Sequence, residues 1–201
     1  GSLGEVGGAK IAGALELAVE DNLKGIPTAA ILLLETGGVR LQEANLGLAA
    51  IAEIQAAIVN LRQYQPVITV VAGSVGCFGG MSIAAGLCSY IVMTQEGRLG
   101  LNGPQVIEQE AGVQEYNAKD RPFIWSITGG NQRFTSGLVD AYVYDDRQKI
   151  RQQVIDYLTQ GVPHQHRSSN YSFYLAKLQQ VDTAEQITPA QVQALYQGEQ
   201  A

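Results

Sequence analysis

The chain has 201 residues, of which 46% are hydrophobic and 16% are charged, and its formal net charge at pH 7 is −6. These values predict one well-buried domain and argue against a nucleic-acid partner, because neutralising phosphates requires a basic surface. Two cysteines are too few for a disulfide framework. No apolar run approaches the roughly 20 residues that a membrane span needs, and no signal segment opens the chain. The sequence therefore predicts a cytoplasmic protein with no membrane partner.

Helix and strand signals alternate along the first half of the chain. Apolar residues from Ile11 to Val19 recur at helical spacing, and the stop signals Gly25 and Pro27 follow them. Three short apolar runs are typical of strands in a parallel sheet, and the first is expected to be buried on both faces. The predicted strands cover residues 28–34, 67–72 and 90–93, and the helices between them cover residues 41–64 and 81–87. This alternation predicts an α/β fold with parallel crossovers.

The composition of the chain changes near Tyr157. Residues 1–157 are predicted to form the domain, whereas residues 158–201 are rich in Gln, Ser and Thr. Pro189 is typical of a helix start within this second segment. We expect residues 158–201 to form a polar, helical extension that packs on the domain or on a partner.

Two glycine pairs follow the first two predicted strands. Gly37 and Gly38 form one pair, and Gly79 and Gly80 precede the predicted helix 81–87. Ligands collect at the carboxyl ends of parallel strands, so both loops are expected at one edge of the sheet. Glycine lets a ligand approach main-chain N–H groups closely, and a helix N-terminus adds its positive dipole end. The four glycines are therefore predicted to form an oxyanion hole, although tight turns or close packing would explain each pair on its own.

Each candidate side chain has a second interpretation. Phe78 either lines an acyl pocket or is a buried aromatic residue in a turn. Arg133 either binds a leaving carboxylate or a cofactor phosphate, or forms a surface ion pair. Cys77 is either a thiolate nucleophile at a helix N-terminus or a small buried residue. His164 and His166 lack a companion ligand at metal-site spacing, so no metal site is predicted.

A serine hydrolase is a competing interpretation. Ser74 follows a predicted strand within residues 72–76 (AGSVG), and Ser74, Asp140 and His164 occur in the chain order of α/β-hydrolases. The spacing argues against it, because four residues intervene before Gly79, whereas a nucleophile elbow turns directly into its helix.

Several ordered segments resemble the carboxyltransferase subunits of acyl-CoA carboxylases, and together they cover most of the chain. They are residues 1–22 (GSLGEVGGAKIAGALELAVEDN), 35–44 (ETGGVRLQEA), 76–84 (GCFGGMSIA), 97–109 (GRLGLNGPQVIEQ) and 129–143 (GGNQRFTSGLVDAYV). Within that superfamily, the forms ETGGVRLQEAN and CFGGM are most similar to the beta subunits of biotin-independent malonate decarboxylases.

The resemblance implies a crotonase (ClpP/crotonase-like) fold, built of repeated ββα units with a parallel sheet. Strands that usually precede the segment matching residues 1–22 would be missing, so the chain looks like a fragment. An unpaired edge or an exposed apolar face is then expected.

The resemblance also implies an activity and partners. A malonyl group, carried as a thioester on the phosphopantetheine of an acyl carrier protein, would be decarboxylated to the acetyl thioester and CO₂ by this carbon–carbon lyase. Neither a directly bound cofactor nor biotin is expected. The implied partners are a homologous gamma subunit, with the active site at its interface, the acyl carrier protein subunit and its transferase subunit.

Site residues carry over from the family onto matching positions. Backbone amides at Gly37 and Gly38, with Val39 following, and at Gly79 and Gly80 would polarise the thioester carbonyl. Gly103 would lie near the carboxyl-transfer site. Loss of CO₂ leaves an enolate, which preoriented N–H donors stabilise without any side-chain nucleophile. Two functions stay open beside this one: a biotin-dependent carboxyltransferase, and a catalytically silent scaffold subunit.

Overall fold

The computed structural model describes residues 1–182, 184 and 187–196. In this part of the chain the strands are β1 (Ser2–Leu3), β2 (Ala30–Leu33), β3 (Gly38–Val39), β4 (Val67–Val71), β5 (Tyr90–Thr94) and β6 (Ala141–Val143). The α-helices are α1 (Glu5–Leu23), α2 (Asn45–Leu61), α3 (Gly80–Leu87), α4 (Pro104–Ala111), α5 (Arg121–Thr128), α6 (Gly130–Thr135), α7 (Arg147–Gln160), α8 (Tyr171–Leu178) and α9 (Pro189–Tyr196). Two 3₁₀ helices, η1 (Leu41–Glu43) and η2 (Arg167–Asn170), complete these elements.

The main sheet is parallel, with the strand order β2-β4-β5-β6. A second, two-stranded parallel sheet pairs β1 with β3. The predicted α/β class and parallel sheet are therefore confirmed. The predicted strands 67–72 and 90–93 match β4 and β5 closely, and the predicted helix 81–87 matches α3.

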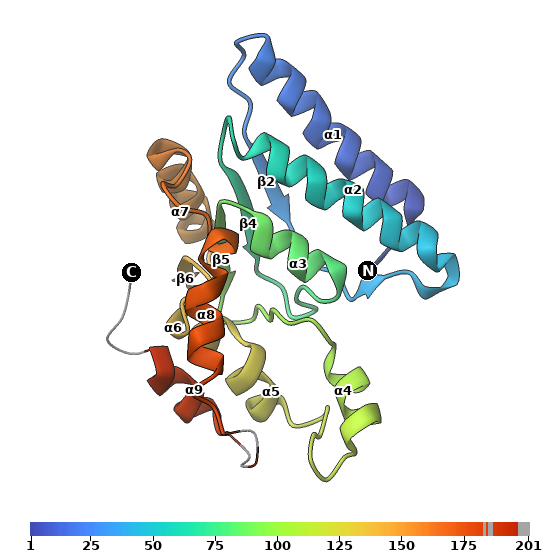
Figure 1. The fold of residues 1–201 in the computed structure, drawn as a ribbon, viewed down its shortest axis with the longest axis vertical. Coiled ribbons are helices and arrows are strands. Elements are labelled where there is room, and N and C mark those ends of the chain that lie inside the picture. The colour runs from blue at the N-terminus through green and yellow to red at the C-terminus, as the bar shows by residue number, and fades with distance from the viewer. Residues whose placement is uncertain (183, 185–186, 197–201) are drawn as a thin grey trace.

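Helices cover both faces of the main sheet. Successive strand residues point to opposite faces, so Val67 and Val71 of β4 pack in the core beneath α1, α2 and α3, while Ile68 and Val70 pack in the core beneath α7. Figure 1 shows α1 and α2 side by side, with α7 across the sheet from them. Tyr157 of α7 stacks on Tyr90 with ring centroids 4.1 Å apart.

Two predicted elements differ from the structure. The predicted helix 41–64 begins instead as the short η1, because Ala44 has φ +45° and interrupts the helical path before α2. The first strand was expected to be buried on both faces, and this is wrong. Leu33 is 76% exposed and Ile31 is 46% exposed, because β2 lies at the edge of the sheet and its outer face is not fully covered by described residues.

The C-terminal elements η2, α8 and α9 pack near α3 and α6. The predicted boundary between residues 157 and 158 falls inside α7, which continues to Gln160. The predicted helix start at Pro189 coincides with the first residue of α9. In the described part of the chain, every helix is too short or too polar to cross a membrane.

Candidate functional site

Three loops meet at the carboxyl edge of the main sheet. They follow β2, β4 and β5, and isolated parallel bridges join Thr36 to Cys77 and Cys77 to Leu99. The Thr36 N–H donates to the Gly76 carbonyl at 2.8 Å, and the Cys77 N–H donates to the Arg98 carbonyl at 2.8 Å. The two glycine pairs thus lie at one edge of the sheet, as predicted. The third loop, residues 95–103, also takes part.

The two glycine loops approach each other closely. A Cβ atom added to Gly79 would lie 3.0 Å from the Gly38 Cα, and both residues have positive φ, +64° and +112°. Glycine at these two positions is therefore required by the backbone conformation and by the contact between the loops. A Cβ on Gly37 would meet nothing within 4 Å, so neither cause explains Gly37.

The backbone N–H groups at the start of α3 differ in their hydrogen bonds. The Gly79 N–H donates to the Leu101 carbonyl at 2.7 Å, and the Ser82 N–H donates to the Gly79 carbonyl at 3.0 Å. The N–H groups of Gly80 and Met81 have no acceptor among the described residues. These first N–H groups of a helix carry its positive dipole end. Gly80 and Met81 therefore offer the donors, whereas the N–H of Gly79 is already occupied.

Donors in the first glycine loop are partly occupied. The Gly38 N–H donates to the Thr36 hydroxyl at 3.1 Å, and the Gly37 N–H donates to the Gly1 carbonyl at 3.2 Å. Val39 pairs with Leu3 in the β1–β3 sheet. The structure thus brings the first pair beside the second but leaves the clearer donors at Gly80 and Met81.

Two predicted substrate-binding residues have structural roles here. Phe78 is buried between the loops, with the Arg98 guanidinium 5.4 Å from its ring centroid. Gly103 is the N-cap of α4, and Pro104 follows at the first helical position. Nothing lies within 4 Å of a Cβ added to Gly103.

Arg133 lies beside a cavity of about 550 Å³ between α4, α5, α6 and α9. Its Nε donates to the Leu99 carbonyl at 2.8 Å, which ties it to the same loop that holds Gly79. Burial lowers the pKa of Arg133, and the nearby Tyr116 and Tyr196 oppose that shift. The predicted surface ion pair of Arg133 is absent from the described residues.

The structure argues against a Cys77 nucleophile. Its side chain is fully buried, and burial raises the pKa of the thiol to about 12, with Cys88 as a second cause. A thiolate nucleophile needs the opposite shift and an accessible sulfur.

The hydrolase triad is not assembled. Ser74 follows the carboxyl end of β4, whereas Asp140 precedes β6, and these strands run parallel, so the two residues lie at opposite edges of the sheet. His164 is exposed in the segment after α7. Among the described residues, no group of three or more His, Cys, Asp and Glu side chains could hold a metal ion.

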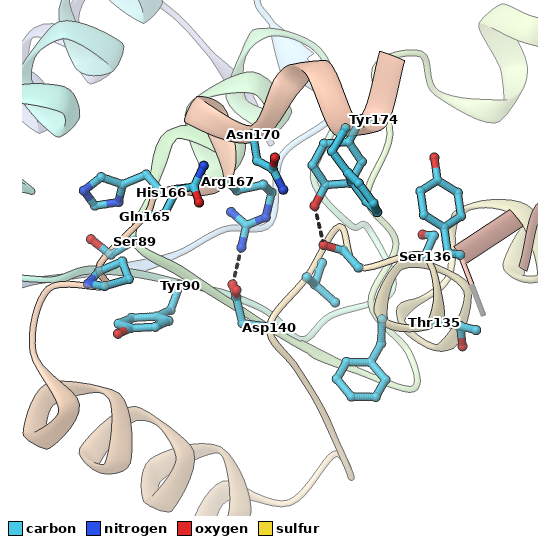
Figure 2. Close-up of a pocket in the computed structure, with 16 residues that line it drawn as sticks. Ser89, Tyr90, Thr135, Ser136, Asp140, Gln165, His166, Arg167, Asn170 and Tyr174 are labelled. Carbon is cyan, nitrogen blue, oxygen red and sulfur yellow. Dashed lines mark hydrogen bonds and ion pairs between the residues drawn. The ribbon is translucent and has the colours of Figure 1, made fainter. Parts of the chain in front are cut away.

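A second cavity, of about 610 Å³, lies at the amino edge of the sheet (Figure 2). Arg167 pairs with Asp140, and the same carboxylate accepts the Ile91 N–H at 2.7 Å. The Tyr174 hydroxyl donates to the Gly137 carbonyl at 2.7 Å. These contacts join the C-terminal elements to the domain, at the edge opposite the glycine loops.

Sequence reasoning missed three residues at this site. Met81 offers a backbone donor, which its side chain does not reveal. Arg98 holds the turn after β4 by donating to the Ser74 carbonyl at 2.6 Å, and its guanidinium lies 4.5 Å from the Trp125 ring centroid. Tyr116 lines the cavity beside Arg133. Arg98 lies inside the matching segment 97–109, which was the only signal for it, whereas Tyr116 lies outside all of the matching segments.

Comparison with known proteins identifies close relatives. A chain of the Pseudomonas malonate decarboxylase hetero-tetramer, crystallised in complex with malonate, is 68% identical, with a TM-score of 0.94 over 97% of this chain and 71% of that one. The Malonomonas rubra malonyl-S-ACP:biotin-protein carboxyltransferase MADC is 41% identical over 162 residues, 76% of this chain and 51% of that protein. The transcarboxylase 12S structure with methylmalonyl-coenzyme A and methylmalonic acid bound is 26% identical, with a TM-score of 0.62 over 77% of this chain and 28% of that chain.

These relatives agree with the predicted crotonase-type carboxyltransferase fold. The chain spans about half the length of the M. rubra protein. No profile of a known protein family matches the chain.

Proposed function

Because this chain belongs to the family of malonate decarboxylase subunits, we propose that it is the carboxyltransferase-like beta subunit of an enzyme that decarboxylates a malonyl thioester. The substrate is carried on the phosphopantetheine of an acyl carrier protein, and the products are the acetyl thioester and CO₂. The main support is the 68% identity to a chain of the Pseudomonas enzyme, together with two N–H donors at the glycine edge.

The proposed reaction needs only one kind of assistance from this chain. The bond between the α-carbon and the carboxylate breaks, and CO₂ leaves. The electron pair of that bond stays with the α-carbon and delocalises onto the thioester carbonyl. Negative charge therefore collects on the thioester oxygen in the transition state. The N–H groups of Gly80 and Met81, at the positive end of α3, stabilise that charge more than they stabilise the neutral carbonyl. The α-carbon then takes a proton from water or from the partner subunit.

Other site residues enter this proposal with smaller roles. Gly37, whose Cβ position is open, lets the thioester approach the first loop, which continues through Gly38 and Val39. Gly79 orients α3 through its bond to the Leu101 carbonyl. The buried Phe78 side chain packs between the loops. Gly103 is the N-cap of α4, which we place near the carboxyl-transfer site.

Partners belong to the same proposal. A homologous gamma subunit completes the active site, and an acyl carrier protein and its transferase deliver the malonyl group without biotin. The hetero-tetramer of the Pseudomonas relative supports this assembly.

A matched pair of variants tests the oxyanion donor. Gly80→Ala and Gly80→Pro both add a Cβ, which would lie 2.8 Å from the Ile51 Cγ2, so the alanine variant controls for this contact. Only the proline removes the N–H, and proline is tolerated at the first position of a helix. In the complex with the gamma-type subunit, we expect kcat to be about 100-fold lower for Gly80→Pro than for Gly80→Ala, the typical cost of one oxyanion donor. Equal kcat values would instead favour a scaffold role.

The biotin-dependent carboxyltransferase is the second candidate, because the M. rubra relative transfers the carboxyl group to a biotin protein. Mass spectrometry of the malonyl thioester after incubation with the complex, with and without avidin, separates the two. We expect acetyl thioester to form equally in both reactions. Inhibition by avidin would assign the chain to the biotin-dependent branch.

A further inference from the structure

The cavity beside Arg133 combines apolar walls with several polar side chains. It measures about 550 Å³, and its walls include Ile107, Ala111, Phe123, Ile127 and Val192. Its polar members are Tyr116, Arg133, Glu115 and Gln132. The Gln132 side chain is satisfied by the Pro189 carbonyl and by Gln193. The other polar members decide what the cavity can bind.

Tyr116 places in this cavity region a hydroxyl that has no hydrogen-bond partner among the described residues. The residue is only 7% exposed, and its ring packs edge-on against Phe123 with centroids 5.5 Å apart. The hydroxyl oxygen is buried and has no hydrogen bond among the described residues. An unsatisfied buried hydroxyl is costly, so such groups in native proteins usually serve a ligand or a water molecule.

Positive charge surrounds this hydroxyl. Burial raises the pKa of Tyr116, and the positive charges of Arg98 and Arg133 partly oppose this shift. Both guanidinium groups therefore interact electrostatically with the phenol. Arg98 is held by carbonyl groups of the turn after β4, but within the described residues the Arg133 side chain donates only through its Nε, to the Leu99 carbonyl. Glu115 also lines the cavity, yet no carboxylate among the described residues lies within 4.0 Å of Arg133.

The cavity adjoins the glycine edge through one loop. Arg133 binds the Leu99 carbonyl, and the Gly79 N–H binds the Leu101 carbonyl. Two residues of an extended chain span roughly 7 Å. The segment from Leu99 to Leu101 therefore joins Arg133 to the loop that precedes α3.

We infer that Arg133 and Tyr116 form a carboxylate site that holds the free carboxylate of the malonyl group. This inference rests on the proposed function and adds a specificity site to it. One guanidinium and one phenol suit the two oxygens of a carboxylate, whereas the apolar walls disfavour a hydrated phosphate dianion. The site acts on the substrate's charge, which disappears as CO₂ forms, so it strengthens substrate binding without accelerating the chemical step.

Malonate binding to the complex of this chain with its gamma-type subunit tests the site directly. By calorimetry, we expect Tyr116→Phe to weaken malonate binding about tenfold and Arg133→Gln about 10- to 100-fold, from the usual worth of neutral and charged hydrogen bonds. Arg121→Gln is the matched control, because Arg121 carries the same charge on the Trp125 ring but does not line the cavity. It should keep the affinity within about twofold.

Kinetics and competing anions complete the test. With the malonyl thioester, Tyr116→Phe should raise KM without lowering kcat, because the carboxylate charge is present in the bound substrate and disappears as CO₂ forms. Acetate and inorganic phosphate should bind more weakly than malonate. Equal malonate affinity in Tyr116→Phe and the unsubstituted complex would overturn the inference, as would phosphate binding as tight as malonate, or a loss confined to kcat. The comparison of Gly80→Ala with Gly80→Pro tests the proposed function separately from this carboxylate site, because it compares kcat values alone.

Discussion

The thiol of Cys77 illustrates how burial decides chemistry at the residue scale. Folding raises its pKa from 9.0 to about 12, chiefly through desolvation. Because the folded state holds this proton more tightly, the thiol's contribution to stability is complete below about pH 9 and is lost as the pH rises towards about 12. Near pH 8, we expect iodoacetamide to alkylate Cys77 roughly a thousandfold more slowly in the folded chain than in urea, since thiolate is the reactive form.

Peptide mass spectrometry over a series of pH values measures this rate. Cys88, whose pKa burial raises to about 11, is an internal comparison and should be similarly protected. Rapid labelling of Cys77 in the folded chain near neutral pH would restore the nucleophile hypothesis.

The candidate site could be predicted where the backbone conformation requires a particular residue type. The requirement for positive φ and close approach selects glycine at positions 38 and 79, and the pattern of pairs after strands identified the correct edge. The hydrogen-bond partner of each N–H was not predictable, because the acceptor of the Gly79 N–H is the carbonyl of Leu101, which only the fold places beside it. Tyr116 was missed because only the fold brings it beside Arg133.

At the scale of elements, long apolar repeats predicted their helices and strands, whereas the short helices α4 and α6 were not predicted. Each of them begins after an N-cap glycine, Gly103 before α4 and Gly129 before α6. Helices of this length have too few turns for a clear apolar stripe. Neither N-cap glycine supplies a side-chain hydrogen bond, so tertiary contacts stabilise these helices instead.

The carboxyl end of α3 is bound by two guanidinium groups. Arg62 donates to the Leu87 carbonyl at 2.5 Å and to the Ser168 hydroxyl at 3.0 Å, while Arg167 contacts the Gly86 carbonyl and pairs with Asp140. Cations are favourable at this negative end of a helix dipole. Arg167→Gln should therefore lower the free energy of unfolding by about 1–3 kcal/mol and speed proteolysis in α8.

Urea denaturation and limited chymotrypsin digestion measure these two effects. Arg147→Gln removes the same charge from an exposed position on α7 with no ion pair in the described part of the chain. It should change the free energy of unfolding by less than about 0.5 kcal/mol. Equal effects of the two substitutions would mean that the contacts at α3 do not anchor the C-terminal segment.

At the scale of the whole molecule, the alternation of strands and helices predicted the parallel sheet, but it could not predict which strand lies at an edge. Residues 28–34 and 67–72 have similar apolar compositions, and β4 is buried on both faces while β2 is not. Strand order depends on long-range contacts that periodicity does not encode. The resemblance, by contrast, led to the expectation of an unpaired edge or an exposed apolar face, and Leu33 and Ile31 of the edge strand β2 are exposed.

The edge strand β2 should make this chain self-associate. Leu33 and Ile31 lie beside a groove of about 690 Å³ that extends to Ile150 and Val154 of α7, and an exposed apolar edge favours pairing between chains. Analytical ultracentrifugation should show dimers or larger species whose fraction rises with concentration. Leu33→Lys should shift the chain towards monomer while changing the free energy of unfolding by less than about 0.5 kcal/mol, because the side chain is exposed. Leu17→Lys, on the exposed side of α1, should leave association unchanged; a chain that is monomeric without any substitution would show that β2 does not drive association.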